Sequence, residues 1–126
     1  MITAKERALQ AVAAALTKNA LQPSLLDVSD KASYTDYILV LSGRSIRQVE
    51  AITEAIQQEL KGQGSDLIGL EGKKGGQWML LDYGDVVIHV FYHPVRDVYD
   101  LEGLWSDAAR VELDVPPELR VAQMYS

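Results

Sequence analysis

A strand–helix–strand pattern in the middle of the chain restricts its fold more than any other feature. The apolar run at Tyr37–Leu41 ends at Ser42-Gly43, and a helix is predicted from Ser45, whose spacing to Gln48 is that of a capping box. Apolar residues then recur at helical spacing, at Ile46, Val49, Ile52, Ile56 and Leu60. A strand predicted at 66–70 follows. Because such crossovers normally form right-handed parallel pairs, the chain is expected to adopt an α/β fold.

The flanking segments extend this pattern to the order α-β-β-α-β-β-β-α. A first helix is predicted from the capping box of Thr3 and Glu6, and a hairpin is predicted around Asp82-Tyr83-Gly84. Pro94 suits the start of a third helix, whose apolar stripe comprises Val95, Val98, Leu101, Leu104 and Trp105. We therefore expect a single domain over 1–108, with a mixed sheet of about five strands and packed helices. Residues 109–126 are expected to form an irregular C-terminal tail, docked or flexible.

Composition narrows the classes of function. The chain has no cysteine, no signal-like start and no apolar run of membrane-span length, so a soluble cytoplasmic protein is expected. The net charge of −6 falls in residues 62–126, which have five basic and eleven acidic residues. This balance disfavours general nucleic-acid binding and suits a basic protein partner, although solubility alone also explains it.

Two candidate binding sites are weak. The loop at 72–76 contains Lys73 and Lys74 among glycines, but it lacks the spacing of a phosphate-binding P-loop and lies between strands. It is interpreted as a flexible connection, with a weak phosphate or RNA contact as the alternative. His89 and His93 lie on or just after a strand, about 13 Å apart, so one metal ion cannot bridge them. His89 is expected to be half-buried with one hydrogen bond.

No catalytic set emerges from the remaining polar residues. Asp27, Asp30 and Asp36 suit turn caps better than a cation site, and the sequence at 42–45 lacks the Gly-x-Ser-x-Gly elbow of serine hydrolases. No metal, cofactor or enzymatic activity is therefore expected.

Two sets of linked motifs do carry a specific resemblance. One runs from Thr35-Asp36-Tyr37 through Ser42-Gly43 to Val49, and the other includes Glu71-Gly72, then 78–91, and then 96–105. Together, over about residues 5–108, the chain resembles the Iojap family, the bacterial ribosomal silencing factors.

The resemblance implies a fold like that of the nucleotidyltransferases without their catalytic carboxylates, since no Asp-x-Asp follows the turn at 42–45. It also implies a function. Such a protein binds the large ribosomal subunit through ribosomal protein L-fourteen, sterically blocks joining of the small subunit and represses translation. A homodimer is implied for the isolated protein, and a minor contact with ribosomal RNA is an open expectation. The alternative is a nucleotide-binding protein or transferase that uses the helix N-terminus at this turn.

The candidate partner-binding residues lie around the third helix and the hairpin. A continuous helix places Arg96, Tyr99, Asp100 and Gly103 in one exposed stripe, where tyrosine and arginine are common interface anchors. Trp78 is a second candidate anchor, with Asp82, Asp85 and Glu102 as an acidic rim for a basic partner. The alternative, that Trp78, Tyr99 and Trp105 all belong to the core, stays open.

Overall fold

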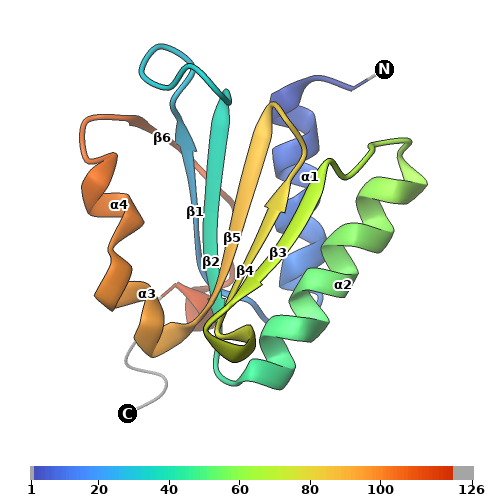
Figure 1. Ribbon diagram of the computed structural model, residues 1–126, viewed down its shortest axis with the longest axis vertical. Helices are drawn as coiled ribbons and strands as arrows, with labels where there is room; N and C mark the ends of the chain where they lie inside the picture. The colour runs from blue at the N-terminus through green and yellow to red at the C-terminus, as the bar shows by residue number, and fades with distance from the viewer. Residues whose placement is uncertain (1, 121–126) are drawn as a thin grey trace.

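The computed structural model describes residues 2–120, which form one mixed sheet with helices on both faces (Figure 1). The predicted α/β class is confirmed. In chain order the elements are α1 (Ala4–Leu16), β1 (Leu21–Asp27), β2 (Tyr37–Gly43), α2 (Ile46–Gly62), β3 (Gly69–Lys73), η1 (Lys74–Gly76), β4 (Trp78–Asp82), β5 (Val86–Tyr92), α3 (His93–Tyr99), α4 (Leu101–Leu104), β6 (Ala109–Val111) and η2 (Pro117–Leu119).

The sheet has six strands in the order β3-β4-β5-β2-β1-β6. Only β2 and β5 pair in parallel, and the other neighbours are antiparallel. β2 was expected to pair in parallel with the strand that follows α2, which is β3. That prediction is wrong, because the parallel partner of β2 is β5. β3 lies at the edge and the hairpin β4–β5 returns the chain to the centre, because the apolar run of β5 is buried from Val86 to Phe91.

The two faces of the sheet pack against different helices. Alternating side chains divide between them, so that Leu41 and Val90 join the core beneath α1 and α2, whereas Val40 and Phe91 lie beneath α3 and α4. Figure 1 shows α1 and α2 side by side on one face and the α3–α4 segment on the other. This second face is covered less completely, and the candidate site lies there.

The helix starts follow the sequence signals. Thr3 and Glu6 form both hydrogen bonds of the predicted capping box, and Ser45 Oγ accepts from Gln48 N at the start of α2. The predicted hairpin turn is present, with Gly84 at φ 86°, which glycine adopts without steric cost. No described helix is both long and apolar enough to cross a membrane.

Two sequence-based expectations fail near the C-terminus. The third helix is not continuous, because Asp100 takes a left-handed conformation (φ 44°) that separates α3 from α4. The stretch after Asp107 is not wholly irregular either, since β6 pairs with β1 as a sixth strand. Val115 and Leu119 are buried against Leu21, so the chain up to residue 120 packs on the sheet. Residues 121–126 of the expected tail lie outside the described part.

Candidate functional site

Four rings gather on the face that α3 and α4 cover. Trp78 of β4 is paired with Phe91 on the neighbouring strand β5, and their ring centroids lie 5.0 Å apart. The ring centroid of Tyr99 in α3 lies 4.6 Å from that of Trp78. His89, on the same face of β5, completes the group at 5.9 Å from Trp78. Tilted ring pairs at such distances are favourable beyond the area that they bury. Trp78, His89, Phe91 and Tyr99 are called the aromatic cluster below.

A hydrogen bond fixes the orientation of Trp78. Its indole Nε1–H donates to Nδ1 of His89 at 3.1 Å, so the neutral imidazole carries its proton on Nε2. Burial, with a smaller contribution from the charge of Lys73, lowers the pKa of His89 to about 4. The acceptor therefore stays unprotonated at neutral pH. The predicted hydrogen-bonded histidine is confirmed, and it is more deeply buried than expected.

Lys73 joins the cluster from the neighbouring strand. Its position opposite Trp78 brings Nζ to 4.7 Å from the centre of the indole ring, a cation–π distance. The same ammonium lies 3.8 Å from a carboxylate oxygen of Glu71. The loop expected at 72–76 is therefore partly strand, and one of its two lysines contacts the aromatic cluster.

The cluster combines buried and exposed rings. Phe91 is fully buried and Trp78 is half-buried, whereas Tyr99 is 37% exposed. Two more apolar side chains of the α3–α4 segment are open to solvent, Val98 at 77% and Leu104 at 71%. Exposed apolar side chains beside ordered aromatic rings are typical of a protein-binding surface. Val98 and Leu104 were expected to be buried, and that expectation is wrong.

The predicted acidic rim is only partly assembled. Asp82 shares the face of Trp78 but lies at the other end of β4, about 13 Å along the strand. Its Oδ1 accepts from Gly84 N at 2.8 Å, so it also stabilises the hairpin turn. Asp85 belongs to the opposite side, where Arg7 of α1 donates to both of its carboxylate oxygens. Asp85 is therefore not a neighbour of Trp78.

The prediction that Arg96 lies on an exposed helix face is wrong. Arg96 is 6% exposed, and its guanidinium donates to the carbonyl oxygens of Leu21 and Gln22, to Ser42 Oγ and to both carboxylate oxygens of Glu102. We call this group the arginine clamp. Burial alone would raise the pKa of Glu102, but hydrogen bonds and charge from Arg96 hold it below its ordinary value. The clamp ties α3 and α4 to the start of β1.

Asp100 and Gly103 shape the break between the helices. Asp100 Oδ1 accepts from Gly103 N at 3.1 Å and so caps α4. A Cβ atom at Gly103 would overlap this carboxylate, which explains a glycine at that position. Both residues are exposed near the aromatic cluster, but their clearest role is to hold the α3–α4 corner that carries Tyr99.

The two serine side chains of the turn at 42–45 are already engaged within the chain and are not available to bind a nucleotide. Ser42 is fully buried in the arginine clamp, and Ser45 Oγ is occupied as the cap of α2. Within residues 2–120, no group of three or more acidic or histidine side chains is arranged to hold a metal ion.

Sequence reasoning missed two members of the cluster as site residues, His89 and Phe91. Their alternation with Ile88 and Val90 placed them on one face of β5. The predicted hairpin made β4 and β5 neighbours, but the register that places Trp78 opposite Phe91 was the missing information.

Comparisons with known proteins point to one family. The model of the family described as "Ribosomal silencing factor during starvation" matches residues 1–125. The chain is 46% identical over 81 residues to ribosomal silencing factor RsfS of Chromobacterium violaceum, covering 64% of this chain and 66% of that protein. It is 39% identical to the RsfS of Halalkalibacterium halodurans, over 82% of this chain and 89% of that one.

A more distant relative and a solved structure agree with this match. Mouse "mitochondrial assembly of ribosomal large subunit protein 1" is 32% identical over 92 residues, which is 71% of this chain and 40% of that protein. A crystal structure of a Chromobacterium violaceum protein superposes with a TM-score of 0.80 at 34% identity, covering 94% of this chain and 98% of that one.

Proposed function

The chain belongs to the ribosomal silencing factor family, and from that premise we propose that it binds the large ribosomal subunit through ribosomal protein L-fourteen. Once bound there, it blocks joining of the small subunit by occupying the space between the subunits, and so represses translation. The action is steric and needs no catalytic residue. We place this role in the cytoplasm.

The observation that carries the proposal is the aromatic cluster with its exposed edge. Tyr99 packs on Trp78, which is fixed by His89, so the ring that faces solvent is already ordered before a partner binds. Ordering beforehand lowers the entropic cost of association. Val98 and Leu104 add exposed apolar side chains on the same α3–α4 segment.

Charge supports a basic partner. Residues 62–126 hold the whole net charge of −6. Asp82 lies in β4 with Trp78, and Asp100 directly follows Tyr99 as the C-cap of α3. Complementary charge steers encounter and orients the partner more than it raises affinity. The proposed contacts with the ribosomal protein are Trp78, Asp82, Tyr99, Asp100 and Gly103. Arg96 and Glu102 act indirectly through the clamp, and Asp85 lies elsewhere.

Two smaller elements complete the proposal. Lys73 and Lys74 border the aromatic cluster and are proposed to make a minor contact with ribosomal RNA. The isolated chain is proposed to form a homodimer, which light scattering at several concentrations would detect.

Calorimetric titration of purified ribosomal protein L-fourteen into the chain tests the proposal. We expect Tyr99→Ala to weaken binding by about 2 kcal/mol, the typical cost of losing an interface anchor. Tyr34→Ala is the matched control, because Tyr34 is also exposed, at 62%, but lies in the loop between β1 and β2. Equal affinities of the two variants would contradict the assignment of the surface.

A further inference from the structure

We propose that the end of the molecule next to the aromatic cluster binds the phosphate backbone of ribosomal RNA. This inference rests on the proposed function, since it assumes that the chain docks on the large subunit. The surface comprises five basic residues from three segments of the chain, Lys18, Arg44, Arg47, Lys73 and Lys74, and is called the basic end below.

Hydrogen bonds join two of the three segments, and packing brings the third beside them. Gln48 Nε2 donates to the carbonyl oxygens of Lys18 and Asn19 at 3.0 and 3.1 Å, and Gln48 Oε1 accepts from Arg44 N at 2.5 Å. One glutamine side chain therefore joins the end of α1 to the start of α2. The turn η1 approaches the same place, where a Cβ atom on Gly76 would lie 3.3 Å from Ile46 Cγ2.

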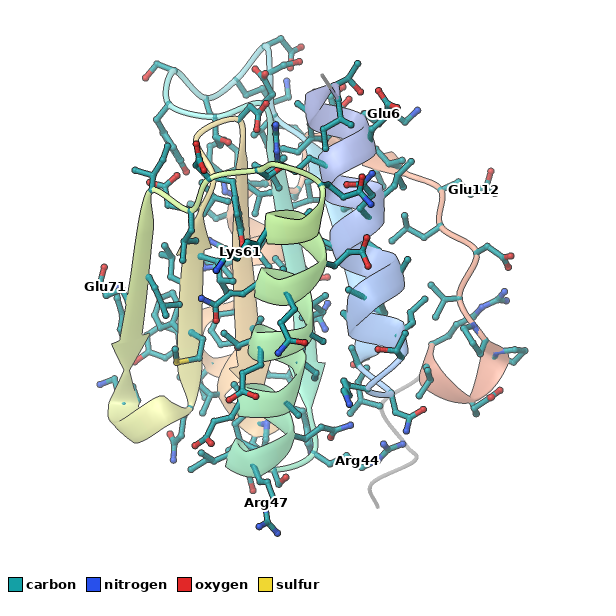
Figure 2. All side chains as sticks on the ribbon, turned by 90° about the vertical axis from the view of Figure 1, so that its right-hand side faces the viewer. Glu6, Arg44, Arg47, Lys61, Glu71 and Glu112 are labelled. Atoms are coloured by element: carbon teal, nitrogen blue, oxygen red, sulfur yellow. The ribbon has the colours of Figure 1, made fainter. Side chains whose placement is uncertain are left out.

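The charge of this end is opposite to that of the whole chain. Segments 17–20, 43–48 and 73–77 contain the five basic residues and no acidic residue, although the net charge is −6. The other end, at 3–7, 27–36, 63–66 and 82–85, has seven acidic and three basic residues. Figure 2 shows Arg44 and Arg47 projecting from one end, with Glu6 near the opposite end.

These basic side chains are accessible. Lys18, Arg44, Arg47 and Lys74 are exposed, and among residues 2–120 no ion pair engages Lys18, Arg47 or Lys74. Lys73 alone is half-buried between Glu71 and Trp78. Exposed cations that cluster on one surface create a local positive potential within an acidic protein.

The chemistry of the basic end favours a nucleic-acid backbone over a second protein surface. The exposed residues of its three segments are polar or basic, and the apolar Ile46 is half-buried, so it lacks the aromatic and aliphatic anchors of a protein interface. Arginine and lysine side chains on several elements can each contact a different phosphate. Lys73 belongs to the basic end and also contacts Trp78 of the aromatic cluster. We therefore expect the chain to contact a protein at the aromatic cluster and RNA at the basic end at the same time.

The test compares two double charge reversals that change the net charge equally. Arg44→Glu/Arg47→Glu alters the basic end, and Lys5→Glu/Lys61→Glu alters exposed lysines of α1 and of the last turn of α2. Circular dichroism first verifies that both variants fold. Binding to purified large subunits is then measured between 50 and 200 mM salt, and binding to isolated ribosomal protein L-fourteen is measured in parallel.

We expect the Arg44/Arg47 variant to bind large subunits more weakly, with a slope of log K against log salt that is smaller by about 1.4 to 1.8, as for two lost phosphate contacts. Its affinity for isolated L-fourteen should match that of the control. Equal slopes for the two variants would overturn the RNA contact, and so would a selective loss of L-fourteen binding at Arg44/Arg47.

The proposed function and the RNA contact can fail separately. If the wild-type chain does not bind L-fourteen, yet its binding to large subunits keeps an Arg44/Arg47-dependent slope, the protein partner is wrong and the RNA surface stands.

Discussion

The α3–α4 segment contributes to two regions, the arginine clamp and the aromatic cluster. They differ in whether their side chains remain available to a partner. On one side, the arginine clamp uses the guanidinium of Arg96 on two carbonyl oxygens, one hydroxyl and one carboxylate within the chain. On the other side, the aromatic cluster orders Tyr99 and leaves it 37% exposed. The first region has no donor left for a partner, whereas the second presents an ordered apolar edge.

The difference separates stability from binding. A buried charged group contributes to a structure only while its partners remain, so changes in the clamp should mainly affect folding. Partly exposed rings bury further area only in a complex, so changes at Tyr99 should mainly affect affinity. Residues that look equivalent on a helical wheel, such as Arg96 and Tyr99, are therefore expected to give opposite phenotypes.

The largest effect is expected from Arg96→Met. The substitution keeps apolar volume but leaves Glu102 and the carbonyl oxygens of Leu21 and Gln22 without their main donor. The free energy of unfolding should fall by about 3 to 5 kcal/mol, the usual cost of breaking a buried ion pair from one side. Urea denaturation measures it. Arg110→Met is the control, because that side chain is 63% exposed and 3.7 Å from Glu102, and it should cost less than about 1 kcal/mol.

The pH dependence of stability tests the buried side of the aromatic cluster. The pKa of His89 is about 4 in the folded chain and near its ordinary value of 6.5 when unfolded. Between these values the unfolded chain binds more protons, so stability is full above about pH 6.5 and falls as the pH drops towards 4, by about 3 kcal/mol.

His89→Asn is the matched variant for this measurement, because its amide oxygen can still accept the Trp78 hydrogen bond but does not titrate. Thermal unfolding from pH 4 to 7 should show the wild-type loss and a flatter profile for the variant. Identical profiles would mean that His89 is not held neutral by burial.

Trp78→Phe should give the smallest effect on stability. The substitution keeps a ring against Phe91 and Tyr99 but removes the Nε1–H that donates to His89. Loss of one neutral hydrogen bond should lower the free energy of unfolding by about 1 kcal/mol, measured by urea denaturation. A loss as large as that from Arg96→Met would erase the distinction between the two regions.

Much of the fold could be predicted from local signals, because caps and apolar periodicity are properties of short segments. The capping box of Thr3, the cap at Ser45 and the turn at Gly84 all stand where the sequence places them. Strand neighbours depend on packing between distant segments, so the pairing of β2 with β5 could not be read from the crossover alone. The three-residue β6 is too short to give a periodic signal.

The candidate site was predicted less well, because tertiary contacts decide which face of the third helix meets the sheet. A continuous apolar stripe through residue 105 placed Arg96 outside and Val98 and Leu104 inside. In the structure α3 buries Arg96 and exposes Val98, and the left-handed Asp100 separates α4, which carries Leu104, from α3. Aspartate tolerates this conformation better than most residues, but nothing local requires it here. The capping bond from Gly103 N is a local contact that supports it, whereas the clamp at Glu102 depends on tertiary packing.

Co-sedimentation of the purified chain with large subunits, small subunits and joined ribosomes is the decisive measurement of the silencing role. We expect binding to free large subunits alone, with fewer joined ribosomes as the chain is added and a much weaker effect for Tyr99→Ala. Binding to no particle, or binding that leaves subunit joining unchanged, would contradict it.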